Sequence, residues 1–145
     1  MQNDISRDIF KLCNLLEDYY EKFLKKYKLK VFDVFILLLI EENEKINQEF
    51  IAHETYRSKT LIAQNVNKLV NRGFIEKRVD LEDKRNNLLF LTEKGSEVCQ
   101  KANKVTNDTN HSLFDGISSF DIQIVKISFR IMIGNLNKIN KKLNS

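Results

Sequence analysis

The side chains with the clearest chemical potential lie in a basic segment near the middle of the chain. From Tyr56 to Ile75 the sequence carries Arg57, Lys59, Lys68 and Arg72 but no Asp or Glu. This absence is unusual, because charged residues make up 30% of the chain. Cations of this kind bind phosphate groups, and such contacts set affinity and salt dependence rather than sequence choice. Arg57, Lys59 and Lys68 are therefore the predicted phosphate contacts.

Short and amide-bearing side chains accompany these cations. Gln64 can form two hydrogen bonds with an adenine edge, and Ala63 is small enough to approach a thymine methyl group. The predicted base-facing set is Ser58, Lys59, Thr60, Ala63, Gln64 and Asn67. Apolar residues at the intervening positions would seat this helix on a core. Taken alone, the segment could equally be a solvated amphipathic helix without a ligand.

Other kinds of functional site have little support in the sequence. It contains no Gly-rich phosphate loop, no Gly-x-Ser-x-Gly elbow and no His-Glu-x-x-His motif. His53 and His111 are isolated, and Cys13 and Cys99 lack the spacing of metal ligands. We therefore expect no enzyme activity, no metal and no cofactor.

The elements that must position the basic helix follow from the apolar pattern. Gly73 should end that helix, and Thr92 should cap the next one. The predicted helices are 31–42, 48–54 and 58–72, and the predicted strands are 74–79 and 88–91. Between the strands, residues 80–87 form an exposed, charged tip. A helix-turn-helix followed directly by a charged hairpin is a winged helix-turn-helix.

Two long helices with narrow apolar stripes are predicted at the ends of the chain. One stripe contains Ile5, Ile9, Leu12, Leu16, Tyr20, Phe23 and Tyr27, on a helix over residues 4–27. The other contains Val125, Phe129, Met132, Leu136, Ile139 and Leu143. Such seams favour partner helices, so both are expected to form a dimerisation bundle with a second copy. The alternative is that both stripes belong to an ordinary intramolecular core.

The predicted fold class is therefore mainly α with a small β-hairpin wing. A chain of 145 residues is too short for two ordinary domains, so we expect one domain over residues 1–145. Within it, residues 31–95 form the winged helix-turn-helix, and residues 1–30 and 96–145 supply the dimerisation helices.

The run from Asp80 to Gly95 carries the most specific motif of the sequence. It places Asp83-Lys84-Arg85 in the hairpin tip and Leu91-Thr92-Glu93-Lys94-Gly95 at the following helix start. This run resembles the wing of the MarR family of transcription regulators, which carries Asp-x-Arg and then Leu-Thr-x-x-Gly. Leu69, Arg72, Gly73, Phe74 and Ile75 are similar to the end of that family's recognition helix and its first wing strand.

The resemblance implies roles for the tip residues. Arg85 would enter the narrow minor groove, where the potential is strongly negative. Asp83 would orient Arg85, because a carboxylate restrains a guanidinium group, and Lys84 would contact phosphate. The sequence departs from the family pattern in the turn from Glu54 to Ser58, which lacks the usual Gly, and near Lys30, where a Pro is often found.

The expected function is therefore that of a sequence-specific regulator binding double-stranded DNA, with a homodimer on a pseudo-palindromic operator. The resemblance implies a repressor relieved by a small aromatic or phenolic effector, or by oxidation of a cysteine. Cys13, in Leu12-Cys13-Asn14, looks like the setting of the family's peroxide-sensing branch and is the candidate redox residue, although a cysteine is often simply buried.

A competing hypothesis is a helical adaptor that binds another protein through the terminal stripes and does not bind DNA. The polar start of the chain and its short apolar runs predict no signal peptide and no membrane segment, and hence a cytoplasmic protein.

Overall fold

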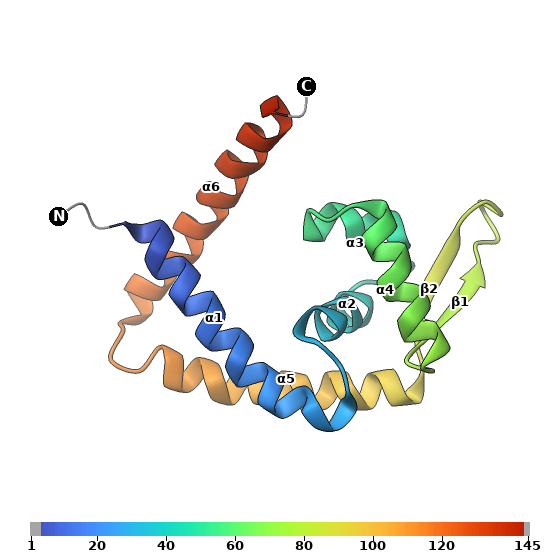
Figure 1. Cartoon of the computed structure of the whole chain (residues 1–145), viewed down its shortest axis with the longest axis horizontal. Helices are drawn as coiled ribbons and strands as arrows, with labels where there is room; N and C mark the ends of the chain where they lie inside the picture. Colours follow the sequence, from blue (N-terminus) through green and yellow to red (C-terminus); the bar gives the residue numbers. More distant parts are fainter. Residues whose placement is uncertain (1–3, 144–145) are drawn as a thin grey trace. The chain divides into compact units, whose positions relative to one another are not determined.

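The computed structural model describes residues 4–143. In that range the elements are α1 (Ile5–Leu24), the 3-10 helix η1 (Lys25–Tyr27), α2 (Val31–Glu42), α3 (Gln48–Thr55), α4 (Lys59–Asn71), β1 (Ile75–Val79), β2 (Asn87–Leu91), α5 (Glu93–Leu113) and α6 (Ser119–Leu143) (Figure 1). The chain forms two compact units, one up to residue 103 and one from residue 104 onward, with the boundary inside α5. The assignment of residues 1–145 to one domain stays a prediction.

The predicted fold class, mainly helical with a small β-hairpin wing, is confirmed. The helix predicted over 31–42 has those bounds as α2, and the helix predicted over 58–72 forms as α4. Ser58 caps α4, since its Oγ accepts a hydrogen bond from the Leu61 amide at 3.2 Å. The first helix differs from the prediction. It ends at Leu24 and tightens into η1, and Lys28 then leaves the helix with a left-handed φ of 53°.

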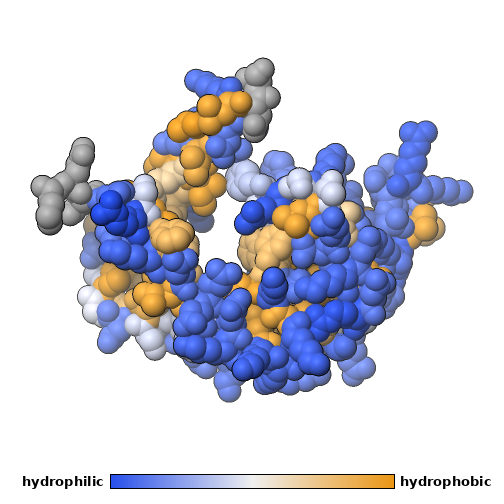
Figure 2. Space-filling view, in the orientation of Figure 1, coloured by the Kyte–Doolittle hydropathy of each residue, from blue (hydrophilic) through white to orange (hydrophobic). Residues whose placement is uncertain are grey.

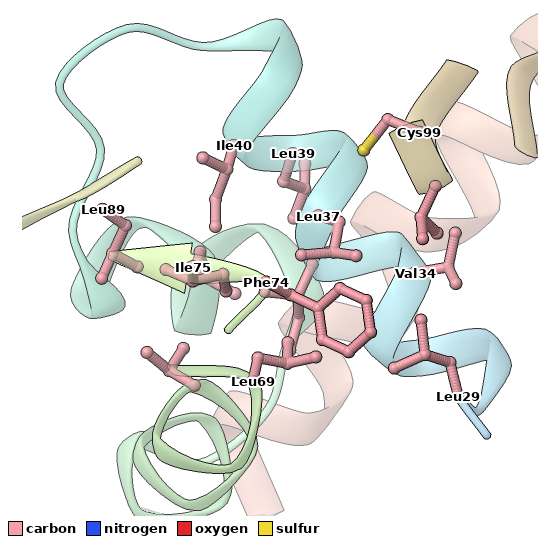
Figure 3. Close-up of a cluster of buried hydrophobic side chains, with 14 of the residues drawn as sticks. Leu29, Val34, Leu37, Leu39, Ile40, Leu69, Phe74, Ile75, Leu89 and Cys99 are labelled. Atoms are coloured by element: carbon pink, nitrogen blue, oxygen red, sulfur yellow. The ribbon is translucent and has the colours of Figure 1, made fainter. Parts of the chain in front are cut away.

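A cluster of buried apolar side chains holds the elements of the first unit together (Figure 3). Phe74 is 1% exposed and lies between Leu69 of α4 and the side chains of α2, among them Leu37 and Val34. Strand β2 contributes Leu89 to the same cluster, and α5 contributes Cys99 and others. Because α4 and the wing are seated on one close-packed core, neither can shift without disturbing the other.

A buried ion pair fixes α4 against α2. Asp33 is 1% exposed, and its Oδ2 accepts hydrogen bonds from the Lys30 amide at 2.9 Å and from Lys68 Nζ at 2.6 Å. The first bond caps α2, and the second crosses to the last turn of α4. A buried carboxylate is stable only with such partners. Lys68 is therefore part of the packing of the helix-turn-helix as well as of its surface.

We expect Lys68→Ala to lower the free energy of unfolding by about 2 kcal/mol, because it leaves the Asp33 carboxylate buried without its cation. The loss should fall below that of a fully buried pair, since the Lys68 side chain is 41% exposed. Urea unfolding at one fixed protein concentration measures it. Lys84→Ala, on the exposed wing tip, is the control and should change stability little. Adding Asp33→Asn to Lys68→Ala should restore part of the loss, and equal losses for both lysines would contradict the assignment.

The end of α4, the wing and the start of α5 meet at Gly73 and Phe74. Gly73, with φ of 75°, ends α4, and the Phe74 amide bonds to the Leu69 carbonyl at 2.9 Å. Thr92 then binds this turn twice, because its hydroxyl donates to the Gly73 carbonyl at 2.7 Å and its amide donates to the Phe74 carbonyl at 3.1 Å. Thr92 also caps α5 as predicted, by accepting a hydrogen bond from the Gly95 amide at 3.2 Å.

Gly95 allows this close approach of α5 to the turn. A Cβ atom at Gly95 would lie 2.3 Å from the Phe74 carbonyl oxygen, which is a backbone atom and cannot swing away. We therefore expect Gly95→Ala to lower the free energy of unfolding by about 2 kcal/mol, although Ala is the better helix former by about 1 kcal/mol. Urea unfolding measures the loss. Ser96→Ala, one residue further along α5, should stay within about 0.5 kcal/mol of the parent. A stable Gly95→Ala variant would show that the turn and α5 can separate.

Helix α6 buries none of its residues. Ser118 caps it, with its Oγ accepting a hydrogen bond from the Asp121 amide at 3.1 Å. Its predicted stripe is largely open to solvent: Leu136 is 58% exposed and Ile139 is 54% exposed. Figure 2 shows apolar side chains gathered along this helix. Among the described residues, no helix is long and apolar enough to cross a membrane.

Candidate nucleic-acid interface

The turn between α3 and α4 keeps a sharp bend without a glycine. Asn47 caps α3 by accepting a hydrogen bond from the Phe50 amide at 2.9 Å. Tyr56 follows α3 with φ of 54°, and the Arg57 amide bonds back to the Ala52 carbonyl at 3.2 Å. Tyr56 thus takes the left-handed conformation for which glycine is favoured, at a cost of about 1 kcal/mol. The departure from the family pattern in sequence leaves the helix-turn-helix intact.

One face of α4 is buried and the opposite face is open. Ile62, Val66 and Leu69 are fully buried in the core. Of the predicted base-facing residues, Ser58, Lys59, Thr60, Gln64 and Asn67 are exposed and Ala63 is half-buried. The Asn67 side-chain oxygen accepts a hydrogen bond from Lys77 Nζ of β1 at 2.6 Å. Short and amide side chains therefore line the exposed face of α4, beside a cation from the wing.

The three phosphate contacts predicted in the basic segment have partners within the chain. Lys68 pairs with Asp33, and Lys59 forms an ion pair with Glu49 of α3. The Lys59 ammonium lowers the pKa of the Glu49 carboxyl, through the hydrogen bond first and its charge second. The Arg57 guanidinium lies 5.7 Å from the centre of the Phe32 ring. All three cations are at least partly exposed, so they remain available to an anion. Lys59 and Lys68 would have to bind that anion in addition to, or in place of, their carboxylate partners.

The wing is an antiparallel pair in which Ile75 lies opposite Leu91 and Val79 lies opposite Asn87. The Leu89 amide of β2 also bonds to the Ile46 carbonyl at 2.9 Å, which attaches the hairpin to the segment before α3. On the outer surface the Arg78 guanidinium stacks 4.3 Å from the centre of the Phe90 ring. The wing is therefore held to the helix-turn-helix at its base, where Ile75 and Leu89 are buried, whereas its far end is exposed.

Asp83 shapes the tip through hydrogen bonds within the turn. Its carboxylate accepts hydrogen bonds from the Arg85 amide at 3.1 Å and from the Asn86 side chain at 3.0 Å. Among the described residues, no ion pair joins Asp83 to the Arg85 guanidinium. The predicted partnership of Asp83 and Arg85 thus runs through the turn, which presents Lys84 and Arg85 as exposed side chains.

Sequence reasoning missed several contacts and cations that build or support this surface. Asp33 is the most informative, because a lone acid inside the apolar run of α2 signals a buried charge that needs a partner. Lys77 and Arg78 on β1 add cations beside the tip. Their position in the predicted first strand of the wing could have indicated that they belong to this surface. Arg72 donates to the Tyr27 and Lys28 carbonyls at 2.7 Å each, so it anchors the end of α4 to the end of η1.

The two cysteines differ in environment. Cys13 is exposed on α1, whereas Cys99 is buried. Burial, and to a smaller extent the charges of Glu41 and Glu42, raises the pKa of Cys99 to about 12, which holds it as an unreactive thiol. Within residues 4–143, no three His, Cys, Asp or Glu side chains gather as a metal site would require.

Solved structures of winged-helix regulators closely match this architecture. The transcriptional regulator SlyA superposes with a TM-score of 0.86 at 25% identity, covering 94% of this chain and 96% of that one. A putative MarR family regulator from Listeria monocytogenes, solved with a 26mer DNA, has a TM-score of 0.85 at 24% identity and covers 93% of this chain and 90% of its own. The winged-helix fold is therefore confirmed.

Curated relatives agree in sequence. The regulator YybA of Bacillus subtilis, described as an uncharacterized HTH-type transcriptional regulator, is 34% identical over 96 residues, or 66% of this chain and 64% of its own length. SarZ of Staphylococcus haemolyticus is 28% identical over 79 residues, or 54% of each chain. The match thus spans less than two thirds of either relative, and both are named as transcriptional regulators rather than enzymes.

More than half of the chain, residues 18–102, matches the family described as transcriptional regulator SarA/Rot. The matched range runs from the middle of α1 through the helix-turn-helix and the wing into α5. Together with the winged-helix neighbours, this match confirms the resemblance drawn from the wing motif and the expectation that the chain is not an enzyme. The chain belongs to the SarA/Rot family of transcriptional regulators, of the MarR winged-helix type.

Proposed function

We propose that the chain binds double-stranded DNA sequence-specifically, with α4 in the major groove and the wing tip in the adjacent minor groove. The observation that carries this proposal is the pairing of two exposed surfaces. The open face of α4 presents Gln64 and Asn67, and the wing tip presents Lys84 and Arg85. The first set has the donors and acceptors that read base edges, and the second has the charge that a narrow minor groove attracts.

We further propose that the regulator is a homodimer on a pseudo-palindromic operator. Support comes from α6, whose apolar side chains are exposed in the single chain, and from the predicted stripe of α1, where Ile5 is 61% and Leu12 is 37% exposed. Exposed apolar stripes of this length are costly in water and favour helix pairing with a second copy. Two recognition helices about one helical turn apart would then read two half-sites, as dimeric helix-turn-helix proteins do.

Binding across a promoter would repress transcription by occlusion. We propose that the signal releasing the protein is either a small aromatic or phenolic effector or oxidation of Cys13. The exposure of Cys13 supports the second route, because oxidants reach it more readily than the buried Cys99. Either signal would act by changing the separation of the two recognition helices, since a dimer with the wrong spacing cannot seat both at once.

The alternative proposal is a helical adaptor that binds another protein through its terminal helices and does not bind DNA. The exposed stripe of α6 fits both hypotheses. Salt dependence separates them, because a DNA-binding protein loses duplex affinity steeply as salt rises, whereas an adaptor shows little duplex binding at any salt. Selection of bound duplexes from a random pool would test binding, palindromy and half-site spacing together.

Arg85→Ala tests the DNA-binding surface. It should remove specific operator binding, lowering affinity by at least about tenfold, while the unfolding curve and the dimer stay unchanged. Fluorescence anisotropy with the selected duplex measures the affinity, and sedimentation measures the dimer. Arg7→Ala, which removes the same charge from the exposed face of α1, is the matched control and should bind like the parent. Equal affinities for both variants would refute the role of Arg85.

Leu136→Asp tests the dimer. A charge in a packed apolar seam is strongly unfavourable, so the variant should sediment as a monomer at micromolar concentrations, where the parent is a dimer. It should also lose cooperative binding to two half-sites. Lys138→Asp, two residues further along α6 and also exposed, should leave the dimer intact. A dimeric Leu136→Asp variant would place the contact elsewhere.

A further inference from the structure

A polar pocket lies where the helix-turn-helix meets the wing. Its volume is about 260 Å³, and it is lined by Asn47, Gln48, Glu49, Lys59, Arg85, Asn86 and Asn87. These residues come from the start of α3, the first residue of α4 and the returning side of the wing. The lining contains two cations, four amide side chains and one carboxylate, but no apolar side chain. Such a lining is suited to a small, charged and strongly hydrated group.

The position of the pocket indicates which group that is. With α4 in a major groove and the wing tip in the neighbouring minor groove, the strand that separates the two grooves must pass between them. Lys59 begins α4 and Arg85 lies in the wing tip, so the pocket that both line occupies this passage. The sugar-phosphate backbone carries one negative charge per nucleotide and supplies most of the hydrogen-bond acceptors in such complexes.

Glu49 gives the pocket an unusual charge balance. Its carboxylate is the one acid in the lining and forms an ion pair with Lys59. Both side chains are well exposed, at 67% for Glu49 and 77% for Lys59, so neither is needed to satisfy a buried partner. An exposed pair of this kind contributes little to stability. The main effect of the pair is that Glu49 neutralises Lys59, the cation that lines the pocket between the two proposed groove contacts.

We propose that this pocket binds a phosphodiester group of the DNA backbone, and that Glu49 weakens this binding by competing with the phosphate for Lys59. The inference rests on the DNA-binding function proposed above. It makes Glu49 a residue that sets affinity without touching a base. The volume is several times the ~30 Å³ share of one water, which leaves room for a phosphate group with its ester oxygens.

Glu49→Gln tests the proposal by a gain of binding. Removing the charge frees Lys59, so affinity for the selected duplex should rise by about threefold to tenfold at 100 mM salt. The slope of log affinity against log salt should become steeper by up to about one per subunit, because one more counterion is displaced. The gain should be the same at pH 6 and pH 8. Lys59 lowers the pKa of the Glu49 carboxyl, so the parent carboxylate stays charged throughout that range.

Glu97→Gln is the matched control. Glu97 forms the same kind of exposed pair, with Lys101 on α5, and does not line the pocket. It changes the net charge equally, so its effect on affinity should stay below about twofold. Equal gains for the two variants would show a general charge effect and overturn the proposal. If the parent binds no duplex at any salt, the proposed function itself fails, which is a distinct outcome.

A neutral phosphate analogue identifies the source of the anion. Duplexes that carry a single methylphosphonate, moved one position at a time, should cancel the gain from Glu49→Gln at one position in each half-site. A gain that survives at every position overturns the assignment to the DNA backbone. Competition by orthophosphate at constant ionic strength would then identify the pocket as a site for the free anion. Unchanged unfolding curves for both variants confirm that the comparison is between folded proteins.

Discussion

The close approach of α5 to the turn at Gly73 and Phe74 is the constraint on which the rest of the first unit depends. Two consecutive backbone carbonyls, those of Gly73 and Phe74, accept hydrogen bonds from the same residue, Thr92. Phe74 itself is buried in the core, and Gly95 leaves no room for a side chain at the contact. The end of α4, the beginning of the wing and the beginning of α5 are thereby fixed to one point. A rotation of the start of α5 would therefore carry the end of α4 and the beginning of the wing with it.

The cations of the basic segment divide between holding α4 in place and facing outward. Arg72 binds the carbonyls at the end of η1, and Lys68 neutralises the buried Asp33, so the C-terminal end of α4 is tied to two other elements. Arg57 and Lys59 lie at the exposed start of α4. Positive charge in this segment thus suits two roles, which are binding phosphate and attaching α4 to neighbouring elements. Amino-acid composition alone cannot show which cation has which role.

Much of the architecture was predictable because local signals agreed. Apolar periodicity gave α2 and α4 close to their observed bounds, Thr92 was recognised as a cap, and Gly73 marked the end of α4. The partners of the cations were not predictable in the same way. Asp33 lies 35 positions before Lys68, and their pairing depends on how α2 crosses α4. The positive φ of Tyr56 was not predictable either, but for a local reason. Tyr rarely adopts a positive φ, so its presence in the turn gives no sequence signal for that conformation.

The acids around the proposed DNA-binding surface have three different physical roles. Asp33 is buried and orders a cation, Asp83 folds the wing tip through the Arg85 backbone amide and the Asn86 side chain, and Glu49 is exposed and paired with Lys59. Phosphate contacts bind every sequence alike, so a carboxylate that weakens one of them lowers non-specific affinity as much as specific affinity. It therefore leaves the ratio between the two unchanged and shortens the time spent on wrong sites. In a genome where non-specific sites vastly outnumber operators, a protein with moderate charge searches faster than one whose cations are all free. The modest net charge of +4 fits this balance, because the proposed affinity would come from the placement of a few cations rather than from a strong overall field.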